Sequence, residues 1–173
     1  MSGLHPTDVK ENFRDELYFV ENSLKTFDYV AIGEIGIDLY WDKTFLKQQQ
    51  EAFTFQIRLA VKNNLPIVIH CREAFDEIFE ILDKENCDIL RGVFHCFTGN
   101  LDQAKKAISL GFLLGIGGVL TFKNGGIDKF LNQINQRYAY NSIVQMSERE
   151  GFQLAQSENP QNGSVRLLLR KFS

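Results

Sequence analysis

The stretch Pro66-Ile67-Val68-Ile69-His70 decides how this chain is expected to fold. It is a near-continuous apolar run, which is typical of a strand covered on both faces in a parallel sheet. A proline is tolerated at the start of such a strand. Two further runs, 29–34 and 92–95, predict strands that end in Glu34 and His95, and residues 112–116 predict a fourth strand.

Helical patterns alternate with these strands, because apolar residues recur there at the spacing of one helix face. The expected helices and their caps are marked by Asp8, Phe13, Leu17, Val20, Leu24 and Phe27; by Thr44, Leu46, Phe53, Ile57, Ala60 and Val61; by Phe75, Ile78, Phe79 and Leu82; by Asn100, Leu101, Ala104 and Ile108; and by Ile127, Phe130, Leu131 and Ile134. Strand and helix in alternation predict an α/β fold with parallel strands and helices outside. The pattern alone leaves both a barrel and an open doubly wound sheet possible.

Composition restricts the function classes. The chain has 173 residues and a net charge of −3, and its pI is about 5.6. A broad basic face for gripping DNA usually goes with a pI above roughly 9, so contacts with nucleic acid must be local, and a bound cation could carry much of them. No apolar run approaches the roughly 18 residues of a membrane span, and the first residues lack the form of a signal peptide. We therefore expect a cytoplasmic protein with no membrane contact.

The cysteines are expected to be reduced. Three are present, Cys71, Cys87 and Cys96, without the regular framework of a disulfide scaffold. Cys71 and Cys96 directly follow His70 and His95, and strand alternation would point them away from those histidines. Buried, inert thiols are therefore favoured over a Cys/His metal site.

Glu34, His70 and His95 form the candidate metal site, since each is expected to be the last residue of an apolar strand. Ligands of parallel α/β folds bind at the carboxyl ends of the strands, and neighbouring strands lie only about 4.8 Å apart. Two imidazoles and a carboxylate suit Zn²⁺, Mn²⁺ or Fe²⁺ with a position left open for water. Such an ion acidifies water and polarises a phosphate or carbonyl group. The alternative, that each is an ordinary polar residue at a strand end, stays open.

Three nearby features allow both a functional and a structural interpretation. Arg72 could bind a phosphate through two hydrogen bonds, or pair with Glu73 or Asp76 on the surface. The segment 98–100, beginning with Thr98, could present N–H groups to an anion at a helix N-terminus, or simply cap that helix. Tyr40 and Trp41 could stack on a base, or cover the end of a barrel.

Four motifs in order resemble those of TatD-type metal-dependent deoxyribonucleases. Gly33-Glu34-Ile35-Gly36-Ile37-Asp38 resembles their GEIGLD motif, and residues 66–73 resemble a proline, an apolar run and HCR. Residues 94–99 resemble HCFSG or HSFSG, and residues 3–6 resemble a G-x-HP turn. The resemblance covers about residues 3 to 134.

The resemblance implies a (β/α)8 barrel with a two-metal hydrolytic site. Glu34 would bridge the metals, and His70 and His95 would complete one site, so these three residues would be both catalytic and metal-binding. His5, Arg72 and Thr98 would bind substrate. The implied activity is hydrolysis of DNA phosphodiesters in the 3′-to-5′ direction, with a divalent ion, commonly Mg²⁺, although Zn²⁺ and Mn²⁺ are chemically possible. DNA is the expected partner, and no obligate protein partner is evident.

The sequence departs from this pattern at both ends. It lacks an HxH pair and a late TDSP-like motif, and a full barrel needs about 250 residues. We therefore expect an incomplete (β/α)8 TIM-type barrel of the metal-dependent hydrolase type. Residues 1–135 would be its core, lacking the first strand or strands, and residues 136–173 a divergent tail that is disordered or out of frame. The chain would be weakly active or inactive unless a partner supplied the missing strands. The alternatives are an inactive metal-binding fragment and a related amidohydrolase that acts on a small ester, amide or lactone.

Overall fold

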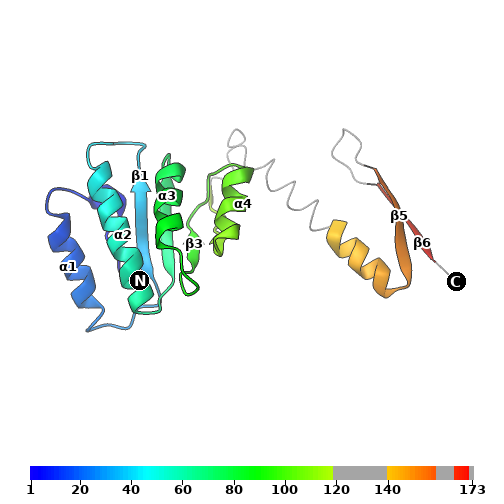
Figure 1. Cartoon of the computed structure of the whole chain (residues 1–173), viewed down its shortest axis with the longest axis horizontal. Helices are drawn as coiled ribbons and strands as arrows, with labels where there is room; N and C mark the ends of the chain where they lie inside the picture. The colour runs from blue at the N-terminus through cyan, green and yellow to red at the C-terminus, as the bar shows by residue number, and fades with distance from the viewer. Residues whose placement is uncertain (119–139, 159–165, 172–173) are drawn as a thin grey trace. The chain divides into compact units, whose positions relative to one another are not determined.

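The structure, a computed structural model, describes residues 1–118, 140–158 and 166–171 (Figure 1). It divides into two units, Met1–Gly125 and Gly126–Ser173, which are described separately. The candidate site residues all belong to the first unit.

The first unit is built on a parallel sheet whose strands follow one another in chain order. Its strands are β1 (Ile32–Asp38), β2 (Ile67–Arg72), β3 (Gly92–Phe94) and β4 (Phe112–Leu114), in the order β1-β2-β3-β4. Ser2 adds a parallel bridge to Ile32 at the free edge of β1. The predicted series of parallel strands is therefore confirmed over the described residues.

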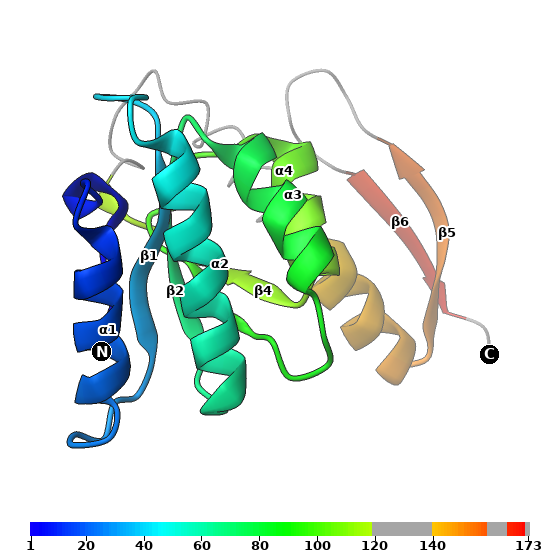
Figure 2. The ribbon, with the colours of Figure 1, turned by 60° about the vertical axis from the view of Figure 1, so that its left-hand side comes forward.

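Helices connect the strands and cover one face of the sheet, as Figure 2 shows for α1, α2 and α3. The helical elements of this unit are η1 (Pro6–Asp8), α1 (Phe13–Ser23), α2 (Leu46–Lys62), α3 (Phe75–Glu85) and α4 (Leu101–Ser109). The buried layer between sheet and helices includes Ile35, Ile37, Phe53, Ile57, Ile67, Ile69, Ile78 and Leu82. In β2, Ile67, Ile69 and Cys71 are buried whereas His70 and Arg72 are not, so the residues with chemistry lie on the face opposite the helices.

Two of the expected helix starts are wrong. Asp8 lies in η1, and α1 begins only at Phe13, because Pro6 starts a separate short turn. Thr44 does not cap α2, since its N–H donates to the Asp42 carboxylate in a turn that precedes the helix. By contrast, Asn100 caps α4 as predicted, with a reciprocal hydrogen-bond pair to Gln103.

Two expected strand ends are also wrong. β1 continues beyond Glu34 to Asp38, and β2 continues beyond His70 to Arg72. The pairing of β1 with β2 shifts between Gly33 and Ile35, so Glu34 lies at an irregularity within the strand. His95, as predicted, directly follows β3.

The second unit contains helical residues at 140–149 and an antiparallel pair, β5 (Phe152–Glu158) and β6 (Arg166–Lys171). These elements lie within the segment 136–173 that the sequence predicted as a divergent tail. The origin of that segment and its boundary at residue 135 stay predictions. The helix expected at 127–134 lies outside the described residues.

Candidate metal centre

Glu34 lies at the centre of a cluster that contains all three histidines of the chain. Its Oε2 atom is 3.1 Å from His95 Nδ1, 3.7 Å from His70 Nδ1 and 4.0 Å from His5 Nε2. Glu34 therefore contacts both His70 and His95, whereas the described residues whose donor atoms all lie within 4.8 Å of one another are His5, Glu34 and His70.

His70 is oriented by Asp38, which is only 4% exposed. Asp38 Oδ2 lies 2.8 Å from His70 Nε2, and Oδ1 accepts the N–H of Tyr40 at 3.0 Å. The backbone N–H of Asp38 donates to Gln49 Oε1 at 2.9 Å, so the carboxylate is held in place. A carboxylate that accepts a hydrogen bond from the N–H of one ring nitrogen leaves the other ring nitrogen free to bind a metal. His70 Nδ1, which faces Glu34, is thus the nitrogen with the free lone pair.

The donor set fits a divalent ion. Ligand atoms of a tetrahedral zinc site, each about 2.0 Å from the ion, lie about 3.3 Å apart. The two distances from Glu34 to His95 and His70, 3.1 and 3.7 Å, bracket that value. Within the described ranges, no lysine or arginine forms an ion pair with the Glu34 carboxylate. A carboxylate surrounded by imidazoles can therefore gain a cation as its partner, and this mixed set of nitrogen and oxygen donors suits Zn²⁺, Mn²⁺ or Fe²⁺.

His5 also belongs to the cluster, but its ring nitrogens have different hydrogen-bond partners from those of His70. His5, Glu34 and His70 each offer one donor atom, and these three atoms lie within 4.8 Å of one another. The rings of His5 and His70 meet edge to face, with their centroids 4.5 Å apart. The Thr7 N–H donates to His5 Nδ1 at 3.3 Å, and if Nδ1 also accepts from the Thr7 hydroxyl, 2.7 Å away, the neutral ring carries its proton on Nε2, toward Glu34. Burial and then the neighbouring His70 lower the pKa of His5, which favours this neutral form. His5 is thus better suited to donate a hydrogen bond than to bind a metal.

Comparison with known proteins shows which family this chain matches. Residues 1–142 match the family of TatD related DNases. The chain belongs to the TatD family. Its relatives include YabD of Bacillus subtilis, an uncharacterized metal-dependent hydrolase that is 39% identical over 122 residues, 70% of this chain and 48% of YabD. The 3′-5′ ssDNA/RNA exonuclease TatD of Yersinia pseudotuberculosis is 34% identical over 73% of this chain and 49% of its own length.

The solved structures agree on the fold. The crystal structure of YjjV, a TatD homologue from Escherichia coli, matches with a TM-score of 0.64 and 32% identity, over 69% of this chain and 46% of YjjV. The first unit is thus an incomplete barrel of the TatD type, which confirms the predicted fold class. The chain spans about half the length of the relatives it matches. Residues 121–168 also match a family described as a protein of unknown function (DUF1257), a similarity that overlaps the end of the TatD match.

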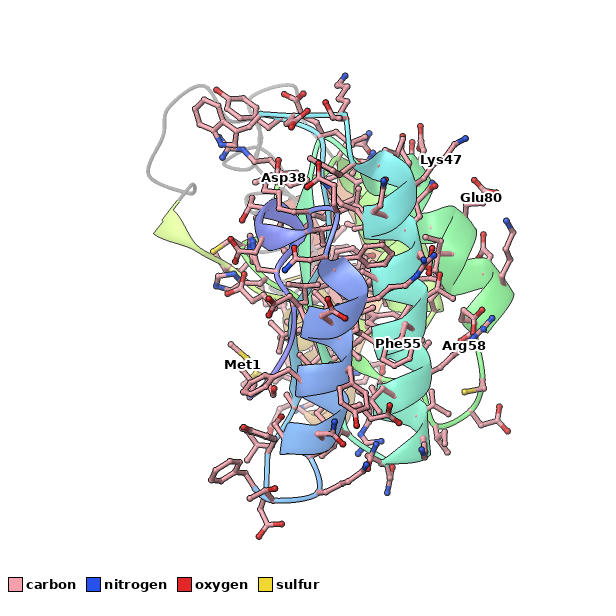
Figure 3. The ribbon with its side chains drawn as sticks, turned by 90° about the vertical axis from the view of Figure 1, so that its left-hand side faces the viewer. Met1, Asp38, Lys47, Phe55, Arg58 and Glu80 are labelled. Carbon is pink, nitrogen blue, oxygen red and sulfur yellow. The ribbon has the colours of Figure 1, made fainter. Side chains whose placement is uncertain are left out.

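Arg72 and Thr98 of this TatD chain are the other residues that the sequence predicted to bind substrate. Arg72 is exposed at the end of β2, and among the described residues it forms no ion pair with Glu73 or Asp76, the structural alternative that the sequence left open. Thr98 is exposed beside the N-terminus of α4. Phe55, Arg58 and Glu80, labelled in Figure 3, are among the residues of α2 and α3 that line a groove of about 520 Å³, and none of the candidate residues lines it.

The two cysteines beside the histidines differ from each other. Cys71 is buried, as predicted. Cys96 is only partly buried, with its Sγ 3.4 Å from His95 Nε2, so the expectation that it points away is wrong. The reason is that β3 ends at Phe94, and Cys96 has a left-handed backbone with φ of 47° to which strand alternation does not apply.

None of the helices described here is both long and apolar enough to cross a membrane.

Cys71 is expected to resist alkylation in the folded TatD chain. Burial raises the pKa of its thiol to about 12, and only the thiolate reacts. Iodoacetamide at pH 8 should therefore modify the exposed Cys87 while Cys71 stays unmodified, as read by peptide mass spectrometry. Equal modification of Cys71 and Cys87 in the native protein would contradict this placement; unfolding in urea, as a control, should make both react.

Proposed function

We propose that this chain carries the metal-binding part of a TatD-type hydrolase that cleaves phosphodiester bonds of DNA. Glu34, His70 and His95 would hold the divalent ion. The observation that carries the proposal is the meeting of Glu34 Oε2 with His95 Nδ1 and His70 Nδ1, at 3.1 and 3.7 Å, with His70 oriented by buried Asp38. The description of the relatives as metal-dependent hydrolases supports it.

Each residue then has a role that follows from its state. A bound divalent ion lowers the pKa of a water molecule and polarises the phosphate. Asp38 keeps the proton of His70 on Nε2 and so keeps Nδ1 available. His5 Nε2–H, 4.0 Å from the Glu34 carboxylate, is a donor for a phosphate oxygen of the substrate, and Arg72 and Thr98 would contact the same backbone. Mg²⁺ would serve in use, with Zn²⁺ or Mn²⁺ as chemically possible replacements, in a cytoplasmic setting.

Nucleic acid is favoured over a small ester, amide or lactone for two reasons. One relative is named a 3′-5′ ssDNA/RNA exonuclease. In addition, the guanidinium of Arg72 lacks a carboxylate partner among the described residues, so its N–H groups are available for a phosphate. The net charge of −3 requires contacts of this local kind in place of a broad basic face.

An exonuclease assay tests the proposal. Single-stranded DNA labelled at its 5′ end is incubated with the purified chain and Mn²⁺, Mg²⁺ or EDTA, beside a p-nitrophenyl ester and a lactone. We expect slow, EDTA-sensitive shortening of the DNA, because a chain that spans about half of its relatives would lack further ligands and the second metal.

The variant Glu34→Gln should abolish the activity, while Glu80→Gln, which removes an exposed carboxylate on α3, should not. DNA cleavage that survives both EDTA and Glu34→Gln would contradict the proposed site. Ester or lactone hydrolysis without DNA cleavage would support the amidohydrolase alternative. A chain that binds metal and cleaves none of these substrates would be the inactive metal-binding fragment.

A further inference from the structure

An exposed stack of two aromatic rings and one guanidinium lies beside the metal cluster. We call Tyr40, Trp41 and Arg72 the aromatic stack. The Arg72 Cζ atom is 3.7 Å from the centre of the Tyr40 ring and 5.6 Å from that of Trp41. The two aromatic rings meet edge to face, with centroids 4.6 Å apart and planes at 88°. Three planar groups from the ends of two adjacent strands thus form one surface.

The backbone joins this stack to the candidate site. Arg72 is paired with Asp38 across β1 and β2, and the N–H of Leu39 donates to the Arg72 carbonyl at 2.9 Å. The N–H of Tyr40 donates to the same Asp38 carboxylate that orients His70. Asp38, labelled in Figure 3, marks the end of the sheet at which this junction lies. A group bound to the stack would therefore be a neighbour of the metal cluster.

Exposure argues against a purely structural role for the stack. Trp41 is 74% exposed and Tyr40 46% exposed, so neither ring is part of the core among the described residues. Trp41 also borders a hollow of about 140 Å³ that it shares with Thr7, Lys10 and Asp38. Large aromatic faces that remain in water beside a hollow are accessible to a ligand.

The stacking contact leaves the N–H donors of the Arg72 guanidinium available. Stacking occupies the flat face of Arg72, whereas its N–H donors lie in the plane and point outward. No ion pair holds those donors within the described part of the chain. One residue can thus extend a stacking surface and bind a phosphate oxygen at the same time.

We propose that the aromatic stack binds an unpaired nucleobase of the substrate, with Arg72 donating to the phosphate beside that base. The site would then select single-stranded nucleic acid, because a base within a duplex offers no free face. The proposal rests on the proposed function and adds the residues that contact the base. Stacking on an aromatic side chain is tolerant of sequence, so we expect little preference among the four bases.

The single tryptophan of the chain makes the test direct, since all tryptophan fluorescence comes from Trp41. The metal-free protein in EDTA is titrated with an oligothymidylate of about eight nucleotides, a length typical of single-strand sites. The comparison ligands are an abasic oligomer of equal length, a duplex, and the corresponding oligouridylate. We expect quenching by the oligothymidylate and none by the abasic oligomer or the duplex. The oligouridylate distinguishes DNA from RNA, and quenching by either one supports the proposal.

Variants separate stacking from charge. By anisotropy of a labelled oligothymidylate, Trp41→Ala should weaken binding roughly 5- to 150-fold, the equivalent of one stacked base. Arg72→Lys, which keeps the charge and loses the plane, should reduce the difference between thymidylate and abasic oligomers. Tyr18→Ala is the matched control, since Tyr18 is 68% exposed on α1.

The results also separate this proposal from the proposed function. Equal quenching by abasic and thymidylate oligomers, binding unchanged in Trp41→Ala, or no binding at all would overturn the stacking site. Metal-dependent cleavage without Trp41 quenching would leave the proposed function standing and reject the stack. Quenching without cleavage would retain the stack and reject the hydrolase.

Discussion

Replacing Glu34 with glutamine is expected to weaken binding of Zn²⁺ or Mn²⁺ by more than about 100-fold, because loss of even an outer partner of a metal ligand costs roughly 10- to 100-fold. Glu34 Oε2 is within 4.0 Å of nitrogens of all three histidines and is the anionic donor among them. Glutamine keeps the shape and removes the charge. Isothermal titration with Mn²⁺, checked by metal analysis after dialysis, measures the change.

The matched control is Glu80→Gln, which removes the same charge from the exposed face of α3. Its affinity should equal that of the wild type, because the general electrostatic effect of one distant surface charge is screened by salt. If Glu34→Gln binds metal as tightly as Glu80→Gln, the carboxylate at the centre of the cluster is not a ligand.

Replacing Phe94 with alanine is expected to lower the free energy of unfolding by about 3–5 kcal/mol, the usual cost of removing a buried phenylalanine. Phe94 is 1% exposed on β3. Its ring centre lies 5.8–6.2 Å from those of four other aromatic rings, which belong to Phe75, Phe79, Phe97 and Phe112. The cavity would therefore open between α3, β3 and β4, directly before His95. Urea unfolding followed by far-UV circular dichroism gives the change.

Phe19→Ala makes the same chemical change at a residue of α1 that is 70% exposed. It should alter stability by no more than about 0.5 kcal/mol. Comparable losses from both substitutions would mean that the aromatic cluster around Phe94 is not the core of this unit. Since single domains are stable by only about 5–15 kcal/mol, the Phe94 variant should be assayed at low temperature.

The succession of strands and helices was predictable from the sequence, because apolar runs and helical spacing are local signals. The residues at which the helices and strands end were less predictable. Phe27 continues the apolar spacing of α1 but lies beyond its last residue, Ser23, and is 61% exposed. β1 was expected to stop at Glu34, since a charged residue after an apolar run usually marks an edge. The strand continues because Gly36, with φ of 144°, lets the backbone of β1 lie against that of β2 where a Cβ would have no room.

The contacts of Glu34 with His70 and His95 were predictable from the sequence, whereas the geometry of the cluster was not. The meeting of Glu34, His70 and His95 followed from parallel topology, which brings the ends of neighbouring strands together. The position of Asp38 did not, because its role depends on a strand that is longer than the apolar pattern indicates. The alternation of side chains along a strand could have indicated this position, because Asp38 lies four residues after Glu34 and therefore on the same face of the strand. Gln49 was missed because a buried glutamine that bonds a backbone resembles an ordinary polar helix residue.

The central claim, one ion held by Glu34 and the imidazoles around it, is tested most directly by NMR of the chain labelled with ¹⁵N in its histidines. Only three imidazoles exist, and all belong to the cluster. On titration with Zn²⁺, we predict that His70 Nδ1 and His95 Nδ1 shift together at about one equivalent, while His5 keeps its proton on Nε2. In Glu34→Gln the shifts should appear only at much higher concentrations. If none of the three imidazoles responds to Zn²⁺, or if each responds at a different concentration, these residues do not form a shared metal site.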